Sequence, residues 1–113
     1  AALVVLLGAT TWMPPGQTEK KPVGMSAFDC GAAWMSVALQ AHAMGWATHG
    51  MGGIERDKLK ESLHVPADHA VIMAFAIGRL GDKGTLPDAL REREMPSTRR
   101  PLAQSIGEGR FPG

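Results

Sequence analysis

Residues 26–53 read SAFDCGAAWMSVALQAHAMGWATHGMGG, and they decide the fold because they predict a long helix followed by a glycine-rich loop. Ser26 with Asp29 resembles a capping box that begins the helix, and Gly45 supplies its end. Apart from a narrow polar stripe, residues 27–44 are apolar around most of the helix. We therefore expect this helix to be buried on more than one side, against chain outside these 113 residues, a second subunit, or both.

Two continuous apolar runs flank this stretch, and at their lengths both predict strands. The first, ALVVLLGA at residues 2–9, is expected to be buried on both faces, and the second, AVIMAFAIG at 70–78, is expected to be central. The remaining segments are expected to be a surface connection at 10–25, a loop at 46–53, an amphipathic helix at 54–65, a short exposed helix at 87–95 and an arm at 96–113. Two central strands alone do not form a stable sheet, so we expect the chain to be incomplete as an independent unit.

The composition limits the classes of function. A formal net charge of +1 lacks the excess of Lys and Arg that nucleic-acid binding needs. One cysteine excludes an internal disulfide and favours a reducing compartment such as the cytoplasm, and Cys30 is expected to be a small buried hydrophobic residue. Polar residues within 30–47 argue against a membrane span. The spacing of the four histidines matches no zinc pattern, so no metal site is predicted. No sequence motif of a protein nucleophile is present either.

Two segments are candidate binding sites. In residues 48–53, THGMGG, the glycines allow a flat or anionic ligand to approach the backbone, although a plain turn after the helix accounts for the same composition. Arg99 and Arg100 lie between two prolines, where a rigid extended segment suits a phosphate clamp, although a solvated basic pair is the simpler interpretation.

In order along the chain, five segments resemble the carboxy-terminal half of the FMN-dependent nitroreductase family. They are LVVLLG, FDCGAAWMSVALQAHAMGW, ATHGMGGIERDKL, VPADHAVIMAFAIGRLGD and REMPSTRRPLAQSIGEGRF. The second resembles the family's D-x-G-x-A helix at Asp29, Gly31 and Ala33. The third resembles the loop that lies against the flavin ring, and the last resembles the arm that closes the domain.

The resemblance implies an α+β fold, with a mostly antiparallel central sheet wrapped by helices and assembled as an intertwined homodimer. It implies that Gly50, Met51, Gly52 and Gly53 form the flavin-ring loop and that Arg99 meets the FMN phosphate, with Arg100 as the alternative. Residues 1–113 would be the carboxy-terminal portion of one such domain, because the family's amino-terminal phosphate-binding segment has no counterpart here. Alone, the chain is expected to be inactive.

The function implied is that of an FMN-dependent oxidoreductase, which passes electrons from NAD(P)H through the flavin to nitroaromatic, quinone or similar acceptors. The cofactor carries this chemistry, which agrees with the lack of a nucleophile motif. Two alternatives stay open. One is a module without cofactor that binds a partner protein through the apolar helix, and the other is an enzyme of the same fold with another reaction, such as dehalogenation.

Overall fold

The computed structural model describes residues 1–110 of the 113-residue chain, which divide into two compact units. The first unit comprises Ala1–Leu80 and contains the sheet and the longest helix, and the second begins at Gly81. None of the helices in the described part has the length and apolar character needed to cross a membrane.

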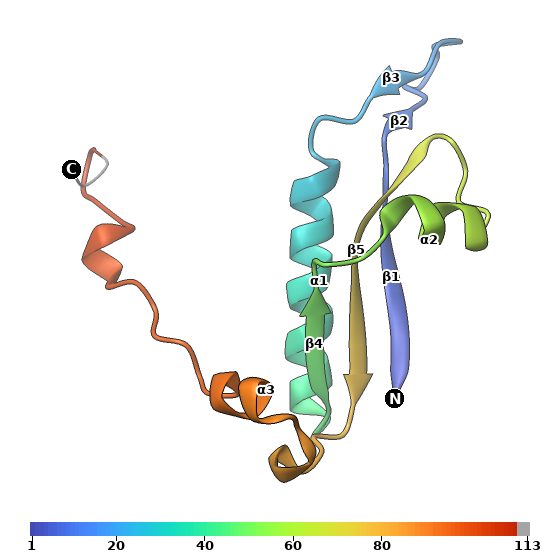
Figure 1. Cartoon of the computed structure of the whole chain (residues 1–113). Coiled ribbons are helices and arrows are strands. Elements are labelled where there is room, and N and C mark those ends of the chain that lie inside the picture. The colour runs from blue at the N-terminus through green and yellow to red at the C-terminus, as the bar shows by residue number, and fades with distance from the viewer. Residues whose placement is uncertain (111–113) are drawn as a thin grey trace. The chain divides into compact units, whose positions relative to one another are not determined.

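A three-stranded antiparallel sheet forms the centre of the first unit (Figure 1). Its strand order is β1 (Ala2–Ala9), β5 (His69–Gly78), β4 (Ala47–Met51), so that β5 pairs with a neighbour on each side. The two strands predicted from apolar runs are confirmed. The expectation that residues 2–9 are buried on both faces is wrong, because β1 is an edge strand of this sheet and the Leu3 side chain is exposed.

The prediction of a loop over 46–53 is wrong for most of its length. Residues 47–51, ATHGM, form β4, which pairs with β5 in a register that places Thr48 opposite Ile77 and Gly50 opposite Phe75. Neither alternation nor a run of β-branched residues marks this segment as a strand. It is extended because β5, which is strongly apolar, offers it a ladder of backbone hydrogen bonds, and tertiary pairing of this kind overrides weak local preference.

Helix α1 (Ser26–Ala43) lies along one face of the sheet and contacts all three of its strands. The helix is confirmed, but the predicted capping role of Ser26 is wrong, because Met25 is the N-cap residue and no side chain caps the helix. Cys30 is buried as predicted, and its thiol lies 3.7 Å from the carbonyl oxygen of Leu7. The helix thus closes one side of the core, whose buried apolar residues are Cys30, Ala41, Val65, Val71, Ala74 and Phe75.

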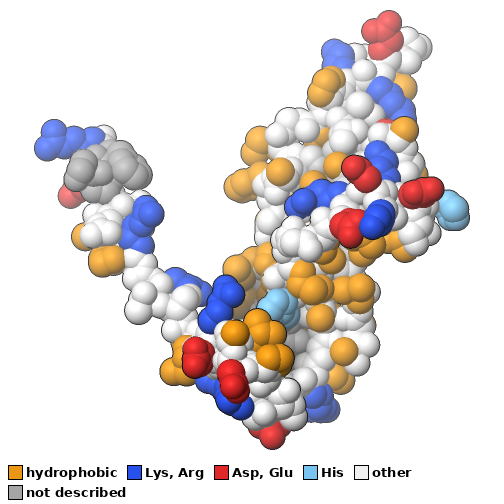
Figure 2. Space-filling model, in the orientation of Figure 1, with side chains coloured by type: hydrophobic (Ala, Val, Ile, Leu, Met, Phe, Trp, Pro, Cys, Tyr) orange, Lys and Arg blue, Asp and Glu red, His pale blue; other side chains and the backbone are white. Residues whose placement is uncertain are grey.

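The opposite side of α1 is apolar and is not covered by the described residues 1–110. Phe28, Met35 and Leu39 share one stripe at helical spacing, and their exposed fractions are 69%, 54% and 63%. The predicted second apolar face therefore exists as an exposed surface of the helix. Figure 2 shows hydrophobic side chains also gathered at the surface below α2, over the strands.

Helix α2 (Arg56–Ser62) lies against β5 and crosses the sheet on the face opposite α1 (Figure 1). It is shorter than the predicted helix at 54–65, since Glu55 is its N-cap residue and His64, with φ of 50°, has already left the helical conformation. The connection at 10–25 contains a small two-stranded ladder of β2 (Thr11–Trp12) and β3 (Lys21–Pro22), which was not predicted.

The second unit contains short helices only, within its described residues 81–110. They are η1 (Lys83–Thr85), α3 (Asp88–Arg93) and η2 (Leu102–Gln104). Helix α3 confirms the predicted short helix in this region, and Pro87 is its N-cap residue. The Lys83 ammonium donates to the Glu94 carbonyl at 2.8 Å and so ties the start of this segment to the end of α3.

Taken together, an antiparallel sheet with helices on it is the α+β architecture that was predicted.

Candidate functional site

The predicted ligand-binding loop begins inside the sheet. Gly50 and Met51 are the last residues of β4, and Gly52 and Gly53 follow in the extended connection to α2. The four residues are therefore contiguous at one end of an anchored strand. They differ sharply, however, in what surrounds them.

The α-carbon of Gly50 lies beneath the indole of Trp34, a residue of α1. A β-carbon at Gly50 would lie 3.2 Å from Cζ2 of Trp34 and 3.0 Å from Cε of Met73. The same indole packs on Phe75, the residue opposite Gly50 in the ladder, with ring centroids 4.6 Å apart. Packing within the chain therefore explains the glycine at position 50 without any ligand.

Gly52 and Gly53 have no such explanation within the described residues. No heavy atom lies within 4 Å of a β-carbon built at either position, and neither residue has a positive φ. Their amide groups also donate to no backbone carbonyl in the described part of the chain. These two residues offer open space and free N–H groups on a surface connection, which is what a flat or anionic ligand needs for close approach.

Arg99 lies in the second unit, where its guanidinium bonds only locally among the described residues 81–110. Its Nη1 atom donates to the side-chain oxygen of Ser97 and lies 3.4 Å from the carbonyl oxygen of the same residue. Arg100, the alternative, is exposed like Arg99. Both arginines are thus available to an anion, and their assignment to a phosphate stays a prediction.

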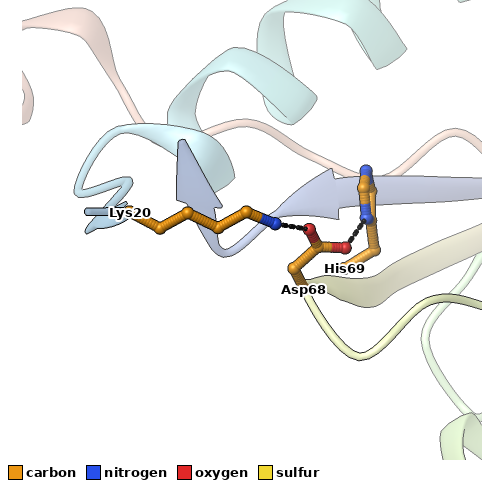
Figure 3. Close-up of polar contacts among 3 residues, drawn as sticks. All are labelled: Lys20, Asp68 and His69. Atoms are coloured by element: carbon orange, nitrogen blue, oxygen red, sulfur yellow. Dashed lines mark hydrogen bonds and ion pairs between the residues drawn. The ribbon is translucent and has the colours of Figure 1, made fainter. Parts of the chain in front are cut away.

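A second cluster of charged side chains lies at the start of β5 (Figure 3). The Asp68 carboxylate accepts from the Lys20 ammonium at 2.6 Å, and its other oxygen lies 2.8 Å from Nδ1 of His69. These hydrogen bonds, that of Lys20 foremost, lower the pKa of Asp68 from 3.8 to about 2. The cluster joins the connection at 10–25 to the central strand, which is a structural role.

A hollow of about 710 Å³ opens between the end of α1 and the adjoining strand ends, and its lining is almost wholly apolar. Trp46, Met44 and Ile77 are its largest side chains, and the Arg79 guanidinium lies 4.7 Å from the centre of the Trp46 rings. Among residues 1–110, no three His, Cys, Asp or Glu side chains gather in an arrangement that could hold a metal ion.

Comparison with known proteins assigns the fold. The model of the nitroreductase family matches residues 1–79, which is more than half of the chain. The chain belongs to the nitroreductase family. The family match includes Gly50, Met51, Gly52 and Gly53 and ends before Arg99.

Solved structures agree with membership of the nitroreductase family. An oxidoreductase containing FMN is 47% identical, with a TM-score of 0.92 over 98% of this chain and 56% of its own. A nitroreductase family protein from Clostridium difficile 630 is 18% identical, with a TM-score of 0.68 over 96% of this chain and 59% of its own. A protein from Exiguobacterium sibiricum 255-15, assigned as a nitroreductase and solved in complex with FMN, is 26% identical. Its TM-score is 0.59 over 73% of this chain and 35% of its own.

The nitroreductase-family chain thus spans somewhat more than half the length of the first two of these proteins. Curated protein sequences gave no match.

Sequence reasoning missed two residues that shape this site in the nitroreductase-family chain. Trp34 was recognised only as one apolar residue of the helix, because nothing in its spacing shows that it covers Gly50. Arg56 is an exposed residue of α2, yet its guanidinium donates to the carbonyl of Ile72 at 3.3 Å, a contact that the sequence pattern does not reveal. One signal for Arg56 was present: a cation in the first turn of a helix opposes the helix dipole, so a specific acceptor was to be expected.

Proposed function

We propose that this protein is an FMN-dependent oxidoreductase that passes electrons from NAD(P)H to an acceptor such as a nitroaromatic compound or a quinone. The observation that carries the proposal is the open, glycine-lined edge at Gly52 and Gly53. Support comes from the family match and from relatives that contain FMN. The bound flavin supplies the redox chemistry.

The residues present fit a flavin. A flat ring needs a wall without side chains, and Gly52 and Gly53 leave that wall bare. Ring heteroatoms also need donors that are not already satisfied, and the amides of these two residues have no backbone acceptor in the described chain. We assign both residues, together with the neighbouring Gly50 and Met51, to the cofactor site, with Gly50 acting through its packing under Trp34.

Arg99 is proposed as the residue that binds the FMN phosphate. Its guanidinium fork matches phosphate oxygens, and within the described residues it bonds to Ser97 alone, in the same exposed segment. Arg100 provides the comparison. Loss of flavin affinity in Arg100→Ala with no loss in Arg99→Ala would transfer the role to Arg100.

We further propose that the chain is the carboxy-terminal portion of a single nitroreductase domain, and that the domain forms a homodimer in the cytoplasm. Two apolar surfaces support the partial domain and the homodimer. The hollow beside Trp46 would take up further chain of the domain, and the stripe of Phe28, Met35 and Leu39 would pack against a second subunit. Gly31 has open space beside that stripe, which lets another helix approach closely, although glycine costs a helix about 1 kcal/mol.

The test is steady-state oxidation of NADH and of NADPH by the complete domain, with a nitroaromatic compound or a quinone as the acceptor. The proposal predicts turnover that requires FMN and both substrates, and no turnover by residues 1–113 alone. Flavin binding without turnover of any such acceptor would favour another reaction of the same fold, such as dehalogenation. Absence of flavin would favour a partner-binding module, for which the uncovered face of α1 is the specific evidence.

A further inference from the structure

Strand β5 contains an irregularity next to the start of α2. In its pairing with β1, Leu6 lies opposite Met73 while Leu7 lies opposite Val71, so Ile72 is an extra residue without a partner. On its other side, the pairing with β4 ends where Met51 meets Ala74. Ile72 therefore lies beyond the end of β4 and within a bulge on the β1 side.

The side chain of Arg56 bonds to Ile72, beyond the end of the pairing between β4 and β5. Its Nη2 atom donates to the carbonyl oxygen of Ile72 at 3.3 Å, in place of a neighbouring strand. Arg56 is the first residue of α2, where the positive end of the helix dipole disfavours a cation. A charge-assisted bond to the Ile72 carbonyl, beyond the last pair of β4 and β5, offsets that cost and fixes the beginning of α2 on the central strand.

The connection between β4 and α2 is consequently tied to β5 at both ends. Met51 is held by its pairing with Ala74, and Arg56 is held by Ile72. Only Gly52, Gly53, Ile54 and Glu55 separate these two attachment points. A segment of four residues that includes two glycines is flexible by composition, so the second attachment, together with the packing of α2 on β5, limits the conformations of Gly52 and Gly53.

We propose that Arg56 is a positioning residue for the cofactor: its bond to the Ile72 carbonyl holds the backbone of Gly52 and Gly53 in the conformation that receives the flavin. This rests on the proposed FMN function. Preorganisation of a binding segment raises affinity because less conformational freedom is lost on binding. Arg56 contributes in this way without contacting the flavin itself.

The experiment compares Arg56→Ala and Arg56→Lys with wild type in the complete domain, and uses Lys58→Ala as the matched control. Lys58 lies on the same helix and carries the same charge. It pairs with Glu55 only at the exposed surface, where an ion pair contributes little, and its ammonium makes no bond to the sheet within the described residues. Two quantities are measured: the FMN dissociation constant by titration, and hydrogen exchange over residues 52–65 in the FMN-free protein.

Arg56→Ala is expected to weaken FMN binding about tenfold, equal to about 1.4 kcal/mol, and to speed exchange over 52–65 while exchange in β1 is unchanged. Arg56→Lys is expected to recover most of both losses, since an ammonium can still donate to one carbonyl, and Lys58→Ala is expected to match wild type. The inference is overturned if Arg56→Ala leaves either exchange over 52–65 or the FMN dissociation constant unchanged, or if Lys58→Ala has the same effects. Should wild type bind no FMN, the proposed function and the positioning role both fail, while exchange alone still decides whether Arg56 anchors the segment.

Discussion

The indole of Trp34 takes the place of the side chain that Gly50 lacks. Its Cζ2 atom lies 3.2 Å from the position of a β-carbon at Gly50, and its ring packs on Phe75 in the adjacent strand. Helix α1 is therefore packed tightly against the end of the β4–β5 pairing, immediately before Gly52. Two glycines only two positions apart in the sequence thus have different reasons to be glycine.

This difference predicts that substitution by alanine lowers the stability of the fold at Gly50 but not at Gly52. Gly50→Ala forces the Trp34 ring and the end of Met73 to move, and we expect a loss of about 1–3 kcal/mol in the free energy of unfolding. Gly52→Ala meets open space, and we expect a change within about 0.5 kcal/mol. Chemical denaturation of the complete domain measures both.

Flavin affinity, by contrast, is expected to respond to substitution at Gly52, where stability does not. Gly52→Ala places a methyl group on the bare wall and should weaken FMN binding by roughly tenfold or more. Equal FMN affinity in wild type and Gly52→Ala would show that this wall does not face the cofactor.

Asp68 predicts how stability depends on pH. Because Lys20 and His69 lower the folded-state pKa of Asp68 from 3.8 to about 2, its contribution is present above the ordinary carboxyl pKa and is lost as pH falls toward 2. Asp68→Asn should therefore reduce stability at neutral pH and give a melting temperature that varies less than wild type between pH 4 and pH 2. Glu19→Gln, beside Lys20 but outside the cluster, should retain the wild-type slope. An unchanged slope in Asp68→Asn contradicts the assignment.

His64 predicts a gain in stability. It follows α2 with φ of 50°, in the left-handed region that costs a residue with a β-carbon about 1–2 kcal/mol. Glycine at position 64 would remove this cost, but it would also make the unfolded chain more flexible, which offsets part of the gain. We therefore expect His64→Gly to raise the free energy of unfolding by about 0.5–1 kcal/mol. Ser62→Gly, inside the helix, should instead lower it by roughly 0.5 kcal/mol. Destabilisation by both substitutions would refute this account of His64.

The uncovered face of α1 predicts the state of assembly. Leu39→Glu places a charge in the stripe shared with Phe28 and Met35, and burial of an unpaired charge in an interface is strongly unfavourable. Light scattering after size exclusion should show a dimer for the wild-type domain and a monomer for Leu39→Glu. Glu61→Lys on exposed α2 is the control, expected to remain dimeric. A wild-type domain that is monomeric would refute the dimer.

The sequence predicted those elements whose own residues determine them. Helix α1 and strands β1 and β5 follow from long apolar runs, whose length and spacing indicate the type of element directly. Strand β4 was missed because its conformation depends on β5 and Trp34, which are distant in sequence. The Ser26 cap was wrong because the helix begins at Ser26 itself, one residue after Met25.

The same distinction holds for the site. Composition singled out 48–53 but could not separate Gly50, which is explained by packing, from Gly52 and Gly53, which are not. The bond from Arg56 to Ile72 depends on a bulge in the pairing of two strands, and no local pattern reveals such a bulge.

The central claim is that Gly52 and Gly53 form part of an FMN site, and the most direct test is a visible absorption spectrum. The complete domain is incubated with FMN, freed of unbound flavin by size exclusion and measured beside residues 1–113 treated identically. We predict flavin bands that stay with the complete domain and are absent from the shorter chain. A complete domain that retains no flavin after this treatment would contradict the account.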